Sequence, residues 1–316
     1  MRTIQPSGAI LGFSLRAAAI LAVLSLFSAP GARAAEGAAS NYFPGAYGDF
    51  LVAVAPEPGP VFLNVSLFYS AQVSTAVREG TIKTDLDATA YYNLMMGLHV
   101  WDAPALGGRF AVGGYVPLGY SHLDASIGQI GVSEDEFNIG DVGIIPASFY
   151  WSRGNFHLNL YEMIIAPTGQ YSTDNLVNIG RNYWSFDTIM AMTWFNPDTG
   201  TEVTITPGVM VNTRNTATDY KTGTEFHVDF MVNQFLSEAF AIGLHGYYYS
   251  QLSGDSGTGA LLGGFKGQSV GLGMALTWMP PSAGGKVLLT GKWLHDVHAK
   301  NRMNADYGTL TLIVTF

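Results

Sequence analysis

The chain ends with Tyr307-Gly-Thr-Leu-Thr-Leu-Ile-Val-Thr-Phe316. From Leu310 to Phe316, apolar residues stand at every second position, and the threonines at 309, 311 and 315 belong to the alternate set. In a β-strand, the apolar side chains therefore share one face and the hydroxyl groups share the other. This pattern, with its terminal aromatic residue, is typical of the closing strand of an outer-membrane β-barrel. A soluble β-sandwich can end in a similar strand, so the rest of the chain has to distinguish the two folds.

The composition favours the barrel. Charged residues make up 12% of the 316 residues, compared with about 25% in soluble domains. After residue 35, no apolar run reaches the roughly 20 residues that a membrane-spanning helix needs. A barrel explains both observations, because its lipid-facing residues alternate along each strand with polar residues of the lumen.

The N-terminus predicts export. Arg2 and Arg16 supply basic residues, residues 17–27 form an apolar core, and Ala32-Arg-Ala34 fits a cleavage site. We therefore predict a signal peptide over residues 1–34. The absence of cysteine excludes disulfides and thiolate catalysis, and the formal net charge of −9 argues against a nucleic-acid partner.

Residues 35–60 differ in composition from the rest. Asn41-Tyr-Phe-Pro-Gly-Ala-Tyr-Gly-Asp-Phe50 is followed by prolines at positions 56, 58 and 60, which remove the amide donors that a central strand needs. The segment is either a periplasmic tail or a plug inside the barrel. Its aromatic residues need burial and favour the plug. The plug candidates are Tyr42, Phe43, Tyr47, Asp49 and Phe50.

Residues 61–316 predict one antiparallel β-barrel of about twelve strands. Strand-like alternation occurs at 61–74, 86–101, 109–121, 138–151, 155–166, 182–195, 201–212, 224–235, 239–250, 267–279, 286–295 and 307–316. Short connections rich in turn residues alternate with longer polar connections, as periplasmic turns and outer loops do in such barrels. The long connections are predicted at 75–85, 122–137, 167–181, 213–223, 251–266 and 296–306. An even number of strands would place both ends of the barrel chain on the periplasmic side.

Several motifs resemble one family of outer-membrane proteins. They are Pro44-Gly-x-x-Gly-Asp-Phe50, Gly140-Asp-Val-Gly-Ile-Ile-Pro146, Pro167-Thr-Gly-x-Tyr171, Asn178-x-Gly-x-Asn-x-Trp184 and Thr222-Gly-x-Glu-Phe-His-x-Asp229. Together they make the chain similar to the transporter family associated with the meta-cleavage pathway of phenol degradation. The resemblance implies a porin-like barrel that takes up aromatic or other hydrophobic compounds. It implies no particular binding residue.

Three ionisable residues alternate with apolar ones between Glu225 and Phe230. A basic residue on the lipid face near mid-membrane costs about 2–4 kcal/mol and an acid costs less, so we expect the ionisable groups to face the lumen. There they either guide a permeant or form a structural network with lumenal cations such as Arg181, Arg214 or Lys292. The candidates for lining the channel or guiding its solute are Glu225, His227, Asp229, Asp187, Tyr161 and Asp141.

No enzyme motif stands out. The seven histidines are scattered, and none lies in a serine-hydrolase or metal-binding motif. His295 and His298 with Asp296 could meet a metal, but a solvated loop also accounts for them. We predict no catalytic residue, no cofactor and no metal. A hydrolase would have to use residues such as Ser185 and His227.

We therefore predict an outer-membrane channel for passive or facilitated uptake of small hydrophobic or aromatic compounds. Its expected partners are outer-membrane lipid, these solutes and the barrel-assembly machinery, which would recognise the strand that ends at Phe316. Twelve strands enclose a narrower lumen than the 16–18 of water-filled porins. Acids in the outer segments form either a solvated rim or a negative mouth that disfavours anions. The alternatives are an outer-membrane lipid or peptide hydrolase and a surface-structural barrel.

Overall fold

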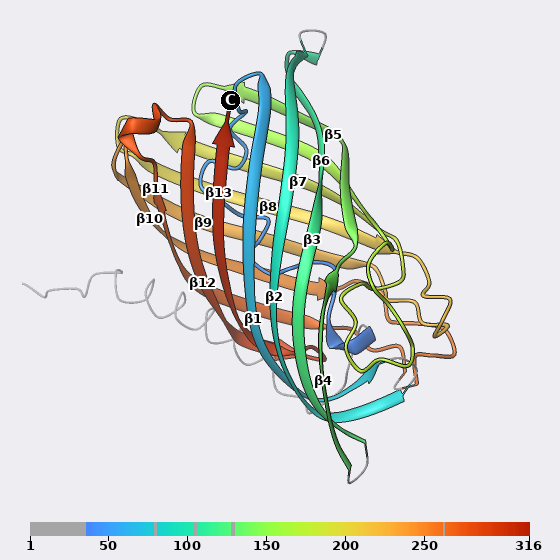
Figure 1. Cartoon of the computed structure of the whole chain (residues 1–316). Coiled ribbons are helices and arrows are strands. Elements are labelled where there is room, and N and C mark those ends of the chain that lie inside the picture. The colour runs from blue at the N-terminus through green and yellow to red at the C-terminus, as the bar shows by residue number, and fades with distance from the viewer. Residues whose placement is uncertain (1–35, 79–80, 104–105, 128–129, 262) are drawn as a thin grey trace, which may run out of the picture. The chain divides into compact units, whose positions relative to one another are not determined.

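The computed structural model describes residues 36–78, 81–103, 106–127, 130–261 and 263–316 (Figure 1). The predicted signal peptide lies outside these residues. The strands are β1 (Gly59–Arg78), β2 (Thr81–Ala103), β3 (Gly108–Ile127), β4 (Ile130–Ile139), β5 (Val142–Arg153), β6 (Phe156–Ala166), β7 (Ser185–Asn196), β8 (Thr201–Asn212), β9 (Glu225–Ser237), β10 (Phe240–Gln251), β11 (Gln268–Trp278), β12 (Val287–Lys300) and β13 (Asn304–Thr315). Two short 3-10 helices are η2 (Glu36–Ala38) and η4 (Pro281–Ala283). No helix in this part of the chain is long and apolar enough to cross a membrane.

The strands form one closed antiparallel barrel. The first strand, β1, pairs with both β13 and β2, and the β2–β3 pairing completes the ring. Both β4 and β5 pair with β3, β4 along the second half of β3 and β5 along the first half. They therefore occupy one position in the wall, interrupted at Gly140 and Asp141, and the thirteen strands make a wall twelve strands around. The predicted barrel of about twelve strands is confirmed.

The two ends of the barrel differ in their connections. At one end, tight turns join β5 to β6, β7 to β8 and β9 to β10, and the backbone amide of Phe316 donates to Pro60 O at 3.2 Å. We call this the turn end. At the other end, the loop end, residues 167–184, 213–224 and 252–267 join successive strands (Figure 1). Short periplasmic turns and long outer loops are the rule in outer-membrane barrels, so the turn end corresponds to the periplasm.

The prediction of long loops at 75–85, 122–137 and 296–306 is wrong. Most of these residues extend the strands β1, β2, β3, β4 and β12. At the loop end, the hydrophobic pattern of β2, β3 and β4 is inverted. Their exposed outward positions carry Asp87, Asp124 and Asp135, whereas Leu86 and Leu123 are buried inside. Strands that rise above the lipid no longer need an apolar exterior, and their polar outward residues resemble those of a loop in the sequence.

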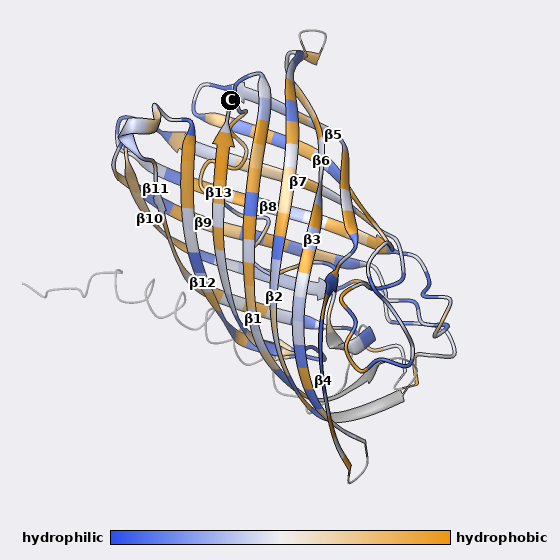
Figure 2. Ribbon diagram, in the orientation of Figure 1, coloured by the Kyte–Doolittle hydropathy of each residue, from blue (hydrophilic) through white to orange (hydrophobic). Residues whose placement is uncertain are grey.

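The middle of the barrel has the exterior of a membrane protein. Outward side chains are apolar and exposed, including Phe68, Val116, Phe230, Leu276 and Leu310. Hydrophobic and hydrophilic residues alternate along these strands (Figure 2). Because the sheet is closed, it has no edge strand whose unpaired backbone groups would face lipid, and the apolar band covers its outer surface. These are the two conditions for spanning a bilayer with strands.

Replacing Leu244 by arginine will lower the free energy of unfolding from lipid vesicles by about 2–4 kcal/mol, the cost of a basic residue facing mid-membrane. Leu244 is 67% exposed on β10, between outward neighbours Val232 and Met274. Leu236→Arg is the control, because Leu236 is 61% exposed but lies near the turn end of β9, where the cost falls to about 0–1 kcal/mol. Urea titration followed by tryptophan fluorescence measures both values. Equal losses would contradict the assigned membrane position.

Candidate functional site

One side of the barrel interior is apolar. Along β1, the side chains of Val61, Leu63, Val65 and Leu67 line the inside. Their partners across the β1–β2 ladder include Leu98, Met96 and Leu94, which also face inward. Barrel lumens are usually polar, so this aliphatic wall is unusual and marks the part of the interior that is suited to apolar solutes.

This wall encloses a cavity of about 280 Å³ together with the segment that precedes β1. Leu63, Leu94, Met96, Ile145 and Met163 are among its aliphatic lining residues. A few polar groups also reach it, including Ser148, Asn159 and Lys292. Small-molecule sites typically combine apolar walls with a small number of polar groups. The cavity has this composition.

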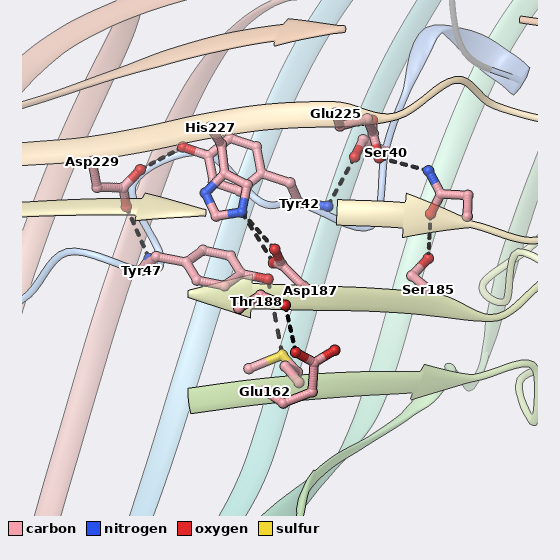
Figure 3. Close-up of polar contacts among 12 residues, drawn as sticks. Ser40, Tyr42, Tyr47, Glu162, Ser185, Asp187, Thr188, Glu225, His227 and Asp229 are labelled. Carbon is pink, nitrogen blue, oxygen red and sulfur yellow. Dashed lines mark hydrogen bonds and ion pairs between the residues drawn. The ribbon is translucent and has the colours of Figure 1, made fainter. Parts of the chain in front are cut away.

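The other side of the interior is polar, and the segment before β1 is bound to it (Figure 3). Asp229 of β9 accepts hydrogen bonds from the hydroxyl of Tyr42 and from the backbone amides of Tyr47 at 2.9 Å and Gly48 at 2.8 Å. Lys292 of β12 donates to Gly45 O at 2.9 Å and to Gly48 O at 2.5 Å. The carboxylate of Asp229 thus accepts from backbone amides of this segment, and the ammonium group of Lys292 donates to its backbone carbonyls.

The segment continues along the barrel in both directions. Toward the loop end, the carboxylate of Glu36 accepts from Asn215 at 3.0 Å and from Thr218 at 2.8 Å. Toward the turn end, Arg109 donates to Pro56 O at 2.5 Å. Residues 36–58 therefore run from the outer loops to the start of β1 through the interior (Figure 1).

All five plug candidates belong to this run. Tyr42 and Phe50 are almost fully buried, and the buried ring of Tyr47 contacts the rings of both Tyr42 and His227. The rings of Phe43 and Tyr307 pack edge to face with centroids 5.5 Å apart. Asp49 lies 3.6 Å from the ammonium of Lys292.

The predicted lining candidates divide into three groups. Glu225, His227, Asp229 and Asp187 are buried together under the segment, on the polar side. Tyr161 lines the apolar cavity. Asp141 lies at the interruption between β4 and β5, where its carboxylate accepts from the backbone amides of Gly169 at 2.8 Å and Arg181 at 2.7 Å.

The buried polar group is hydrogen-bonded internally (Figure 3). His227 Nε2 lies 3.0 Å from both carboxylate oxygens of Asp187, and its ring stacks on Tyr42 with centroids 4.3 Å apart. Glu225 accepts from the Tyr249 hydroxyl and from the side-chain amide of Asn212, the latter at 2.9 Å. The network and the bound segment together cover the polar wall.

Sequence reasoning found Tyr161 and the plug residues Phe43 and Phe50 on the lining of the apolar cavity but missed its aliphatic residues. In β1, the aliphatic residues at positions 61, 63, 65 and 67 face inward, whereas the outward face combines Phe62 and Phe68 with the polar residues Asn64 and Ser66. Alternation alone places the more apolar face of a barrel strand against lipid. The local pattern of β1 therefore predicts the opposite orientation and could not reveal the aliphatic interior.

The structure does not join the residues that a hydrolase would need. The Ser185 hydroxyl donates to Asn212 Oδ1 at 2.6 Å, whereas His227 contacts Asp187. His295 and His298 lie in strand β12 rather than in a loop, and His295 contacts Asp306 at 3.0 Å. Among the residues that the structure places, no three histidine or acidic side chains gather as a metal site requires.

Asp219 is a tightly bound acid at the loop end. Asp219 accepts from the hydroxyl of Thr258 at 2.7 Å and from its backbone amide at 2.9 Å, and it pairs with Arg214. The hydrogen bonds from Thr258 and the contact with Arg214 hold the pKa of Asp219 well below its usual range, because they stabilise the carboxylate. This part of the rim is therefore ionised but locally neutralised.

A family model described as "Putative MetA-pathway of phenol degradation" matches residues 70–312. The chain belongs to this family. The resemblance inferred from the motifs is thus confirmed. No curated protein matches the sequence at a significant level.

Solved structures with a similar fold include an outer membrane channel and the beta domain of an autotransporter. An outer membrane channel from Pseudomonas putida is 16% identical with a TM-score of 0.65, over 87% of this chain and all of the other. The beta domain of the Bordetella autotransporter BrkA is 14% identical with a TM-score of 0.50, over 82% of this chain and all of the other. At these identities the likeness concerns the fold. With the apolar band, it identifies this family member as an outer-membrane β-barrel.

Proposed function

We propose that this protein is an outer-membrane channel for passive or facilitated uptake of small hydrophobic or aromatic compounds. The observation that carries the proposal is the aliphatic cavity of about 280 Å³ inside the barrel. An apolar cavity of about 150 Å³ is large enough to hold benzene, so a substituted aromatic ring fits in this one. Membership of a family described by phenol degradation supports the same class of solute.

The segment of residues 36–58 acts as a plug in this proposal. It fills the polar side of the lumen, where Asp229, Glu202 and Lys292 bind its backbone. What remains beside it is the apolar wall, so a solute that passes the plug contacts aliphatic side chains. The segment thereby narrows the path and excludes ions and sugars more strongly than it excludes apolar rings.

A substitution that fills the cavity tests this path. Met96→Trp places a larger side chain at an inward position that lines the cavity, and it should slow the entry of labelled phenol severalfold. Met95→Trp is the matched control, because Met95 is the next residue of the same strand and faces lipid. Entry is measured in bacteria whose outer membrane carries either variant as the main channel. Equal entry rates for wild type, Met96→Trp and cells without the protein would refute the proposal.

A further inference from the structure

A second, smaller cavity lies closer to the loop end than the apolar cavity does. It measures about 80 Å³, and its lining includes two arginines, Arg181 and Arg302, with Tyr69, Tyr92 and Tyr307. Phe43 lines both cavities, so they adjoin at its side chain. A solute moving inward from the loops reaches the cationic cavity before the aliphatic one.

Arg302 follows β12 in the short connection to β13, and its side chain is directed inward. Only 8% of the residue is exposed, and its Cζ lies 3.8 Å from the centroid of the Tyr249 ring. Its Nη1 is buried and has no hydrogen-bond partner within the described residues. A buried guanidinium with an unused donor is costly unless an anion accepts from it.

The acids beside Arg302 are engaged elsewhere. Glu225 accepts from Tyr249 and Asn212, and Asp296 accepts from Tyr247 and from the backbone amide of Ala305 at 3.0 Å. In the part of the chain that the structure describes, the ion pairs of arginine are those of Arg109 and Arg214. The lining of the small cavity therefore contains two arginines and, among the residues that the structure describes, no acidic side chain.

We propose that this cavity binds the carboxylate of an aromatic acid, with Arg302 as its main partner and Arg181 as a second cation. A planar guanidinium presents parallel N–H donors that match a carboxylate, and Phe43, which lines both cavities, offers an aromatic surface to a ring that extends toward the aliphatic one. The inference rests on the proposed channel function and narrows its solutes to amphipathic ones. The anionic group is held at the arginines while the ring faces the aliphatic cavity.

Calorimetric titration of the purified full chain in detergent tests this site. The probes are sodium benzoate, uncharged benzamide of nearly the same size, and inorganic phosphate. We expect benzoate to bind, and Arg302→Gln to weaken its binding by about tenfold or more, as the loss of charge-assisted hydrogen bonds does. Arg181→Gln should weaken it less, and benzamide should respond to neither change. The matched control is Arg214→Gln, which removes an arginine of the loop end that is already paired with Asp219 and should leave benzoate binding unchanged.

The outcomes separate the site from the channel. If benzoate binds equally well to wild type, Arg302→Gln and Arg181→Gln, the proposed carboxylate site is refuted, and this holds even if the protein accelerates phenol entry. If phosphate binds as tightly as benzoate, the site is one for inorganic anions and the aromatic-acid assignment fails. If benzoate binding depends on Arg302 but no solute crosses, the site stands and the channel function falls. Should Arg302→Gln fail to fold, Arg302→Lys, which keeps the charge without the planar donors, should bind benzoate more weakly than wild type.

Discussion

Replacing Asp229 by alanine will raise the ion conductance of the protein in planar bilayers, because the segment of residues 36–58 will leave the lumen more often. Asp229 accepts three hydrogen bonds from this segment, two of them from the backbone amides of Tyr47 and Gly48. Breaking a buried charged network by removing one partner costs about 3–5 kcal/mol. Since about 1.4 kcal/mol is a factor of ten, the released population should increase by about two orders of magnitude or more.

The control for this variant is Asp198→Ala. Asp198 lies in the exposed turn between β7 and β8, so its removal changes the net charge equally without touching the segment. Single-channel recording should give frequent large openings for Asp229→Ala and wild-type behaviour for Asp198→Ala. If Asp229→Ala stays as closed as wild type while folding normally, the segment is fixed by other contacts and does not gate the lumen through Asp229.

A disulfide introduced between positions 48 and 229 should make the conductance depend on redox conditions. The chain has no cysteine, so cysteines introduced at Gly48 and Asp229 can pair only with each other within one molecule. A Cβ added at Gly48 would lie 3.0 Å from the Cβ of Asp229, and a disulfide needs about 3.5–4.5 Å, so the two backbone segments need to separate by roughly half an ångström. The terminal methyl of Met231, which the added Cβ would overlap, also has to move aside. Oxidised Gly48→Cys/Asp229→Cys protein should conduct little, and reduction should open it because the Asp229 acceptor is gone.

The single variants give the comparison for this disulfide. Asp229→Cys alone should conduct under both redox conditions, whereas Gly48→Cys alone keeps the carboxylate and should stay largely closed in both. Bilayer recordings with and without reductant measure the change on one preparation. A double variant that forms the disulfide, shown by mass spectrometry, and still conducts as much as its reduced form would contradict a path governed by this segment.

The sequence predicted the barrel wall well, because lipid imposes the pattern there. Outward positions such as Phe230, Leu276 and Leu310 must be apolar at every second residue, and strand number and closure follow from counting these runs. The same rule fails where lipid ends. Beyond the bilayer, Asp87 and Asp124 face outward, so the strands continue where the pattern indicates loops.

The interior could be predicted only in part. The alternation from Glu225 to Asp229 placed the ionisable groups inside, but it could not reveal that Asp229 binds amides 181 and 182 residues away in the sequence. Arg302 fell in a stretch that reads as a solvated loop, and only the tight β12–β13 connection directs its side chain inward. Contacts between distant segments are set by the closure of the whole ring, and no local pattern encodes them.

The aliphatic wall of β1 has a consequence for the protein before it reaches its membrane. Residues 61–69, Val-Phe-Leu-Asn-Val-Ser-Leu-Phe-Tyr, contain no charge and no proline, and seven of the nine are aliphatic or aromatic. Such a stretch readily self-associates while it is unfolded. During transit through the aqueous compartment between the two membranes it has neither lipid nor partner strands to cover it. Periplasmic chaperones that shield nascent barrels from aggregation should therefore hold this stretch until β1 pairs with β13.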